Sequence, residues 1–330
     1  MIRIPSIPPR VGKVNAPKIN TNQNIKTIFI SIASYRDPDL VNTVRNAYEN
    51  AAFKNRLFFS IVSQAAPQEH PDLSFIPEEQ LRYEKISWQE SQGACWAREI
   101  ASRRIEHDYY LQIDSHSRFI PNWDKVVLEN YVMCEKHWGS DIAFTMHPRG
   151  FRRNHETGEE NFYDFGKKPL VGFMGWKEGE SMPWPIWYDV EYSKYGYEAY
   201  FLCANSLFCD AKIIKAIPYD HQLYFIGEEP TLALRFYTRG VKLINPSFHY
   251  MWHAYNDEYR TDKRRLHWDD NPDWDNMNGH SYNRAAKILT GDMSLGVYGI
   301  GSKELYDQFQ EKSGITLHDK REHIIGHYKV

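Results

Sequence analysis

Residues 109–116 read YYLQIDSH, a short apolar run that ends in an aspartate and a histidine. The run from Tyr109 to Ile113 has the length and composition of a buried strand, and Asp114 ends it. Strand-like and helical segments alternate in short units on both sides of this run. This alternation predicts an α/β fold with a mostly parallel sheet flanked by helices. Ligands bind at the carboxyl ends of strands in such sheets, so the segment after residue 113 is a predicted site.

Upstream of that run, the hydrophobic pattern predicts three further strands and two helices. Leu40, Val44 and Ala47 recur at the spacing of a helix with one buried face. Residues 1–24 contain four prolines and show no periodicity, so we expect an extended tail followed by a single domain over 25–330. The expected strands are 25–34, 57–64 and 83–88, and the expected helices run from Asp37-Pro38 to about residue 52 and over 91–105.

Downstream, the hydrophobic periodicity is regular up to about residue 146, is absent over 147–200, and is regular again after residue 200. Residues 147–200 are rich in Gly, Trp, Tyr and Pro and lack a clear period. We expect this stretch to be an irregular, aromatic-rich insertion that acts as a lid or binding loop. The segments expected to be ordered are a helix over 123–135, a strand over 141–145, an ordered run over 201–208, helices over 210–216 and 228–238, and a strand over 241–244.

The composition predicts a globular protein of the cytoplasm. Of the 330 residues, 42% are hydrophobic and 25% are charged, and the net charge is −3. This balance lacks the basic field of a non-specific nucleic-acid binder, so a nucleic-acid partner is disfavoured but stays open. No run reaches the roughly 18 apolar residues of a membrane span, and no secretory signal precedes the domain. The four cysteines form no CxxC pair, which indicates buried free thiols.

Asp114 and His116 are spaced to share one ligand. Residues i and i+2 of an extended chain point to the same side, so both side chains can converge on one metal ion. A carboxylate with an imidazole suits Mn²⁺ or a similar divalent ion, Mg²⁺ included, better than Ca²⁺. The competing interpretation is a polar loop with a helix cap, because an Asp-x-His triplet is common by chance. The position after a buried strand favours the metal site.

Four stretches carry a resemblance to a known family. They read IFISIASYRDPDL (28–40), SQGACWAREIASRRIEHDYYLQIDSHSRFIPNWDKVVLENY (91–131), FIGEEPTLALRFYTRGVKLINPSFHYMWHAY (225–255) and YGIGSKELYDQFQEKSGI (298–315). In this order they resemble the N-acetylglucosaminyltransferases that modify hydroxyproline on the Skp1 protein in protists. The likeness covers roughly residues 25 to 317. It is more specific for the family than for the acceptor.

The resemblance implies a GT-A fold, a UDP-linked sugar donor, a divalent metal ion and transfer with retention of anomeric configuration. Residues 25–146 would form the nucleotide- and metal-binding half, and residues 147–330 the sugar and acceptor half. Asp114 and His116 would hold the metal that bridges the donor's phosphates. A late histidine would be the third ligand, and the His-x-Tyr pattern favours His253 over His249.

The resemblance also implies catalytic roles for one arginine and two glutamates. Arg98 would add a second positive charge beside the diphosphate, with Gln92 before it on the same segment; the alternative for Arg98 is a solvent-facing helix position. Glu228 and Glu229 would reach the hydroxyls of the donor sugar and the acceptor. Carboxylates suit hydroxyls because they accept strong hydrogen bonds. Their alternative role is to stabilise the start of a helix.

Two further segments are expected to contact the donor. The loop after the first strand would receive the uridine, with stacking on the base and hydrogen bonds to base or ribose; its residues are Ser34, Tyr35, Arg36 and Asp37. Asp37 is also placed to cap the following helix. Ala204-Asn205 occupies the place of a small Ala-Gly or Gly-Gly pair in related transferases, so the larger Asn205 leaves the donor sugar open. Trp184, Trp187, Tyr188 and Tyr192 fit an acceptor groove or ordinary aromatic packing equally well.

The leading hypothesis from the sequence is a retaining, metal-dependent enzyme that moves N-acetylglucosamine from UDP-GlcNAc to a hydroxyl group on a protein. A second hypothesis keeps the chemistry but uses another UDP-sugar, or a saccharide or modified-DNA hydroxyl as acceptor. A third is a non-catalytic carbohydrate-binding protein. The full set of diphosphate-side residues argues against the third hypothesis, because a lectin has no need for them.

Overall fold

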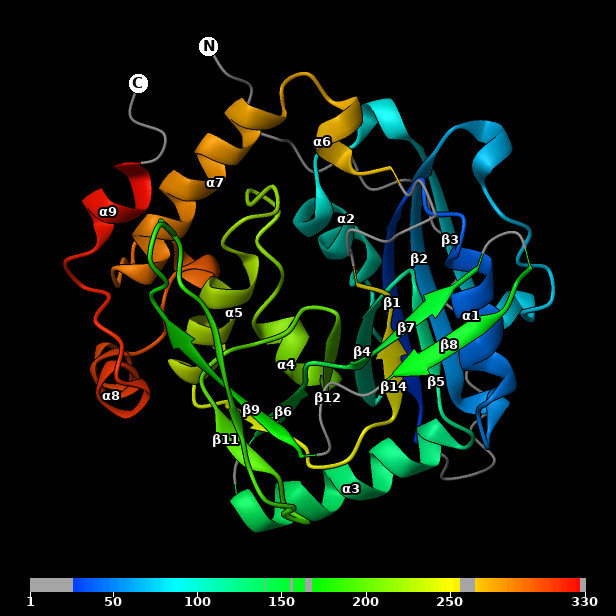
Figure 1. Ribbon diagram of the computed structural model, residues 1–330, viewed down its shortest axis with the longest axis horizontal. Helices are drawn as coiled ribbons and strands as arrows, with labels where there is room; N and C mark the ends of the chain where they lie inside the picture. The colour runs from blue at the N-terminus through cyan, green and yellow to red at the C-terminus, as the bar shows by residue number, and fades with distance from the viewer. Residues whose placement is uncertain (1–25, 140, 155–156, 164–167, 256–264, 327–330) are drawn as a thin grey trace.

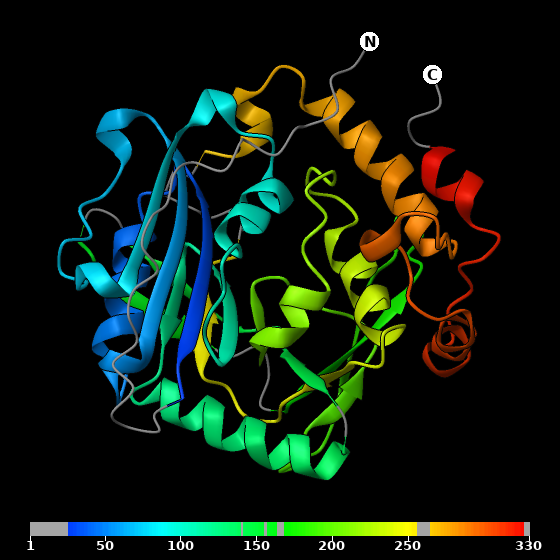
Figure 2. The ribbon, with the colours of Figure 1, turned by 180° about the vertical axis from the view of Figure 1, so that it is seen from behind.

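The computed structural model describes residues 26–139, 141–154, 157–163, 168–255 and 265–326, and its architecture is a large sheet with helices on both faces (Figures 1 and 2). The tail predicted over residues 1–24 lies outside the described residues. Among those residues, no helix combines the length and the apolar character needed to cross a membrane.

The central sheet has eight strands in the order β11-β13-β6-β12-β4-β1-β2-β3. Four of the seven neighbouring pairs are parallel, because β12 inserts antiparallel between β4 and β6 and β11 adds antiparallel to one edge. The prediction of a mostly parallel α/β sheet is therefore confirmed. The strands are β1 (Ile28–Tyr35), β2 (Leu57–Ala65), β3 (Leu81–Ser87), β4 (Tyr109–Asp114), β6 (Ile142–Thr145), β11 (Tyr197–Ala199), β12 (Ser206–Asp210) and β13 (Lys242–Asn245).

Both faces of the sheet are buried. Along β1, Ile28, Ile30 and Ile32 pack into a core that includes α1 and α3, whereas Phe29 packs on the other face with residues of α4 and α5. Alternation of this kind follows from the two-residue period of a strand. The helices that follow the strands are α1 (Leu40–Glu49), α2 (Ala94–Ala101), α3 (Trp123–Trp138), α4 (Ala211–Ala216) and α5 (Glu228–Tyr237), and the C-terminal helices are α6 (His267–Asp270), α7 (Trp274–Leu289), α8 (Lys303–Ser313) and α9 (Arg321–Ile325).

Helix α2 is shorter than the predicted helix over 91–105. It starts after Gly93, whose φ is +99°, and the N–H of Ala94 donates to the backbone oxygen of Tyr224 at 3.0 Å. A side chain on Gly93 would meet that oxygen at 2.4 Å, so glycine is required at this close approach. The helix ends at Ala101, and Arg104 shortly after it has a φ of +60°. Local apolar spacing did not indicate either boundary.

The prediction that residues 147–200 are irregular is wrong for much of the stretch. It contains β7 (Arg149–Arg153), β8 (Glu160–Tyr163), β9 (Leu170–Gly175) and β10 (Trp184–Asp189), besides β11. These strands are short, and they pair through backbone ladders whose side-chain packing a local pattern does not reveal. For example, the ring of Trp187 on β10 lies so close to Gly172 on β9 that a Cβ there would meet it at 2.6 Å.

A smaller four-stranded sheet, in the order β5-β14-β7-β8, brings the late histidine segment to the end of β4. Strand β5 (Ser117–Phe119) follows β4 directly, and β14 (Met251–His253) pairs with it antiparallel, with His253 opposite Ser117. A residue from far along the chain is thereby placed beside the Asp114–His116 segment.

The four cysteines are buried and unpaired, as the sequence indicates. Cys95, Cys203 and Cys209 lie in the core of the sheet face that packs against α4 and α5. Burial raises the pKa of all three thiols well above its ordinary value, because the thiolate would lose its hydration. They behave as small apolar side chains.

Candidate active site

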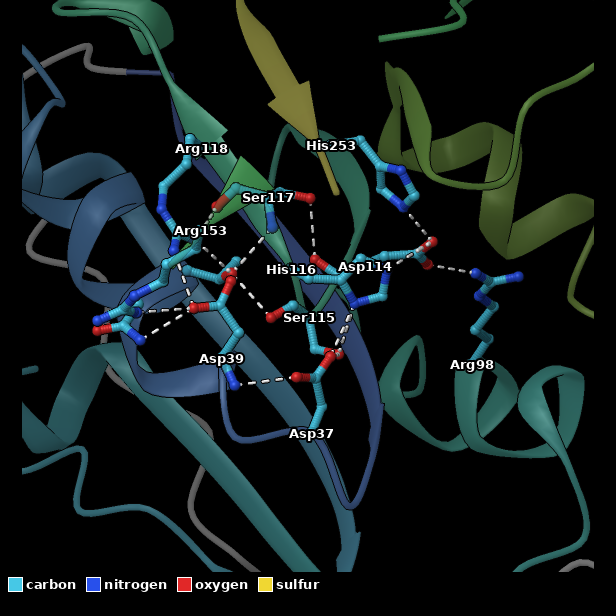
Figure 3. Close-up of polar contacts among 12 residues, drawn as sticks. Asp37, Asp39, Arg98, Asp114, Ser115, His116, Ser117, Arg118, Arg153 and His253 are labelled. Carbon is cyan, nitrogen blue, oxygen red and sulfur yellow. Dashed lines mark hydrogen bonds and ion pairs between the residues drawn. The ribbon is translucent and has the colours of Figure 1, made fainter. Parts of the chain in front are cut away.

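Asp114, His116 and His253 meet at the carboxyl end of β4 (Figure 3). One ligand atom from each lies within 4.8 Å of the others. The Nε2 atom of His253 is 3.0 Å from the Oδ2 atom of Asp114, and the Nε2 atom of His116 is 3.9 Å from the same oxygen. Within the described residues, this is the group of acidic, histidine and cysteine side chains that fits a metal ion, and His249 is not a member of it.

The chemistry of this triad suits a divalent cation. One carboxylate and two imidazoles form a mixed oxygen and nitrogen set of the kind that binds Mn²⁺ and similar ions. Both histidines are buried, at 8% exposure for His116 and 6% for His253, so a bound ion would be shielded from bulk water on their side. The residues present therefore fit the metal ion that the sequence implies.

Arg98 connects this triad to a glutamate on α5. Its guanidinium donates to the Oδ1 atom of Asp114 at 2.6 Å and to both carboxylate oxygens of Glu228. Burial alone would raise the pKa of the Asp114 carboxyl, but Arg98 and His253 outweigh it and hold that pKa well below its usual range. Burial also raises the pKa of Glu228, with Arg98 opposing the shift.

Asp37 lies on the other side of His116. Its Oδ2 atom is 2.7 Å from the Nδ1 atom of His116 and accepts the Oγ–H of Ser115 at 2.7 Å. Its Oδ1 atom accepts the N–H of Asp39 at 2.9 Å, one residue before α1 begins. Figure 3 shows the ring of His116 between the carboxylates of Asp37 and Asp114.

A pocket of about 290 Å³ opens beside the triad. The expected site residues that line it are Tyr35, Asp37, Arg98, Asp114, His116 and His253. The Arg36 side chain instead pairs with Glu69 at 2.6 Å and with Asp270 at 2.9 Å. The Ser34 backbone oxygen accepts a hydrogen bond from Gln64, and the Oε1 atom of Gln92 is buried. Asp270 also accepts the hydroxyl hydrogen of Tyr35 at 3.1 Å.

Part of the lining of this pocket was not predicted from the sequence. It contains Tyr224 and Phe225, before α5, and Arg265 to Trp268, at the start of α6. Tyr224 and His267 contact each other through the hydroxyl and the Nδ1 atom, and the edge of the Tyr35 ring meets His267 at 4.9 Å between ring centroids. The only sequence signal was a pair of aromatic residues in polar surroundings, which does not distinguish a pocket wall from packing.

Glu229 lies apart from the Glu228–Arg98 pair. Its Oε1 atom accepts the backbone N–H of Ala204 at 2.9 Å, and the backbone oxygen of Ala204 accepts from Gln112 at 2.6 Å. Burial raises the pKa of Glu229 to about 7, although the Ala204 N–H works in the opposite direction. The Oδ1 atom of Asn205 is buried next to this pair. Ala204 and Glu229 thus lie together in the structure, with Asn205 adjacent to them.

An aromatic series runs from the triad to β10. The ring of His253 lies 4.5 Å from that of Tyr255, which is 4.8 Å from His147, which in turn is 5.1 Å from Trp187. Of the four aromatic residues singled out in 184–192, Trp187 is thus connected to the triad. Tyr188 and Tyr192 are 52% and 71% exposed.

Comparisons with known proteins identify the family of the chain and a related fold. The family model described as Glycosyltransferase (GlcNAc) matches residues 27–79 and 72–316. The crystal structure of S. aureus TarS matches 88% of this chain at 13% identity with a TM-score of 0.50, and the chain spans 43% of the length of that protein. The structure of S. aureus TarS 1–349 in complex with UDP-GlcNAc matches 86% of this chain and 71% of its own at 12% identity, with a TM-score of 0.48. No curated protein matches. The likeness to the first TarS structure supports a glycosyltransferase fold.

Proposed function

The chain belongs to the GlcNAc glycosyltransferase family, and we propose that it transfers N-acetylglucosamine from UDP-GlcNAc to a hydroxyl group, with a divalent metal ion and with retention of configuration. The observation that carries this proposal is the triad of Asp114 with the two buried histidines His116 and His253, next to Arg98 at the edge of a pocket. Sugar transfer from a nucleotide diphosphate leaves negative charge on the departing phosphate, and a divalent ion held by this triad would, together with Arg98, place positive charge beside it.

Asp114, His116 and His253 would hold the ion, which would neutralise the diphosphate and fix its geometry. Arg98 contributes a charge that does not depend on the metal. Its guanidinium lines the pocket, and its contact with Glu228 holds it there without competing solvent, since both side chains are buried. Preorganised charges in a site of low polarity stabilise developing negative charge far better than mobile ones do.

The donor's nucleoside would occupy the part of the pocket that lies away from the triad. Tyr35, His267 and Trp268 all line the pocket and are aromatic, which suits a planar base. The uridine identity comes from the family resemblance of the loop after β1. Arg36, whose guanidinium is paired with Glu69 and Asp270, would act by shaping this loop.

The sugar of the donor would lie beside Ala204, Asn205 and Glu229. Glu229 takes no part in the ion pair that Arg98 forms with Glu228, so its carboxylate would accept hydrogen bonds from sugar hydroxyls. The proposed acceptor is a hydroxyl group on a protein, as the resemblance to the Skp1-modifying enzymes implies. In this proposal residues 25–330 act as one catalytic domain.

The proposed retention of anomeric configuration is supported by the contacts of the carboxylates that line the pocket. Inversion requires a general base that deprotonates the acceptor. Among the described residues that line the pocket, the carboxylates are Asp37 and Asp114, and both are already bound to histidine or arginine. The leaving phosphate would then take the proton of the acceptor on the same face.

A donor screen tests the proposal. The full chain would be incubated with UDP-GlcNAc, UDP-GalNAc, UDP-glucose, UDP-galactose and GDP-mannose, with and without Mn²⁺, and the released nucleotide measured. Slow hydrolysis by water gives a signal even without the acceptor. We expect the fastest release from UDP-GlcNAc with Mn²⁺. Faster release from GDP-mannose, or equal release after chelation, would contradict the proposal.

A further inference from the structure

The carboxylate of Asp37 forms hydrogen bonds with other residues of the protein through both of its oxygens. It is 8% exposed, and its Oδ2 atom contacts the Nδ1 atom of His116 and the hydroxyl of Ser115, each at 2.7 Å. Its Oδ1 atom accepts the N–H of Asp39 at 2.9 Å. A base or ribose that approached Asp37 would have to compete with these contacts. Asp37 therefore faces the metal ligand more than the nucleotide.

The contact between the Asp37 carboxylate and the Nδ1 atom of His116 determines which ring nitrogen of His116 carries the hydrogen and which one faces the triad. An ionised carboxylate is an acceptor only, so the Nδ1 atom of His116 carries the hydrogen. In a neutral imidazole the Nε2 atom then has the free electron pair that a metal ion requires. That Nε2 atom is the one 3.9 Å from the Oδ2 atom of Asp114, and the rings of His116 and His253 lie 4.7 Å apart.

The backbone around His116 is fixed as well. The hydroxyl of Thr43, on α1, donates to the backbone oxygen of Ser115 at 2.8 Å and accepts the N–H of Ser117 at 2.9 Å. Thr43 is fully buried. Because Asp37 lies three residues before α1 and accepts the N–H of Asp39 at the start of that helix, the same helix anchors both the turn that carries His116 and the carboxylate that orients its ring.

We propose that Asp37 is a positioning residue of the metal site, which fixes the tautomer and the orientation of His116, and that it does not bind the nucleotide. This inference rests on the proposed function, because it assumes that Asp114, His116 and His253 hold a divalent ion. Second partners of ligating histidines typically contribute about 10- to 100-fold to metal affinity. The sequence had suggested Asp37 as a contact for base or ribose, or as a helix cap.

Two titrations separate these roles. Calorimetry would measure the binding of Mn²⁺ alone and of uridine alone to the full-length wild type, Asp37→Ala and Asp37→Asn. Glu69→Gln is the matched control, because Glu69 pairs with Arg36 in the same region without contacting the triad. We expect Asp37→Ala to lower Mn²⁺ affinity about 10- to 100-fold and to leave uridine affinity unchanged. Asp37→Asn, which keeps an acceptor oxygen, should lose less, and Glu69→Gln should match wild type for Mn²⁺.

A second measurement detects the tautomer without metal. Long-range ¹H–¹⁵N correlation spectra of the histidine rings distinguish a hydrogen on Nδ1 from one on Nε2. We expect His116 to carry its hydrogen on Nδ1 in the wild type and to populate the Nε2–H form in Asp37→Ala. Circular dichroism would verify that the variant is folded.

The possible failures are distinguishable. If the wild type binds Mn²⁺ and Asp37→Ala binds it equally well with an unchanged tautomer, this inference is overturned and the proposed function stands. Weaker uridine binding in Asp37→Ala at unchanged Mn²⁺ affinity would make Asp37 a nucleotide contact and overturn it too. If the wild type binds no Mn²⁺ at all, the proposed function and the inference fail together.

Discussion

The guanidinium of Arg98 lies 2.6 Å from the carboxylate of Asp114, although Arg98 is on α2 and Asp114 ends β4. The other side of the guanidinium faces Glu228, so one cation stands between two acids. Both Arg98 and Glu228 are buried, at 6% and 5% exposure. A buried charge is costly unless its partner is present, which makes this pair a sensitive point for both stability and catalysis.

Removing one member of the pair should cost more than removing both. Arg98→Met would leave Glu228 buried without its cation, and we expect the free energy of unfolding to fall by about 3–5 kcal/mol. The double variant Arg98→Met/Glu228→Gln removes both charges and should recover part of that loss, because the two effects are coupled. Urea denaturation of the two single variants and the double variant measures this. Additive losses would show that the two side chains act independently.

The triad should be essential for transfer. Asp114→Ala, His116→Ala and His253→Ala remove members of the only group in the described residues that fits a metal, so we expect each to abolish sugar transfer. His249→Ala is the matched control from the same segment and should retain most activity. Product formation, with circular dichroism to verify folding, is the measurement. If His249→Ala were the more damaging change, the third ligand would have to be reassigned.

The nucleotide should be recognised through Tyr35. Stacking of a base on an aromatic ring is worth about 1–3 kcal/mol, so Tyr35→Ala should weaken UDP binding about 5- to 150-fold. Tyr35→Phe, which keeps the ring and loses only the hydroxyl contact with Asp270, should bind UDP nearly as well as the wild type. Calorimetric titrations with UDP, GDP and CDP in the presence of Mn²⁺ test both points. Tighter binding of GDP than of UDP would refute the uridine assignment.

Glu229 should make stability depend on pH. Its pKa is raised from 4.5 to about 7 in the folded protein, chiefly by burial. The folded state therefore holds this proton more tightly than the unfolded state, and its stabilising effect is full below pH 4.5 and disappears as the pH rises through about 7. Glu229→Gln keeps an acceptor for the Ala204 N–H but cannot ionise. We expect the stability of wild type relative to this variant to fall by the order of 1–3 kcal/mol from pH 4.5 to pH 8. Parallel stability curves in urea would contradict the raised pKa.

The sequence was sufficient for the parts of the fold that local patterns encode. Strands β2 and β4 are mostly apolar runs, and the predicted runs at 57–64 and 109–113 match them to within one residue at each end. The convergence of Asp114 and His116 could also be predicted from the sequence, because side chains two residues apart in an extended chain point to the same side. His253 required the family resemblance, since its place depends on the pairing of β14 with β5.

What the sequence did not predict depends on contacts between distant segments. Glu228 was expected to meet sugar hydroxyls, but 130 positions of chain separate it from Arg98, its actual partner. The role of Asp37 depends in the same way on the ring of His116, 79 positions away. Strands β9 and β10 pair where the ring of Trp187 packs on Gly172, and no periodic pattern in the sequence records that match.

The stereochemistry of the product is the most direct test of the mechanism. Attack from the face opposite the leaving group would need a free carboxylate near the acceptor, whereas Asp37 and Asp114 already accept hydrogen bonds from His116 and Arg98. Same-face attack needs only a stabilised phosphate that can take the acceptor's proton, so we expect an α-linked product. Removing the positive charge beside that phosphate, as in Arg98→Ala, should lower kcat about 100- to 1000-fold, by analogy with the loss of one donor from an oxyanion site. The double variant Arg98→Ala/Glu228→Gln controls for instability, because a purely structural effect would be relieved in it while the loss in kcat would persist. Proton NMR of the anomeric signal decides the linkage, and a β-linked product would require a general base other than Asp37 and Asp114, for which Glu229, outside the Arg98 ion pair, would be the candidate.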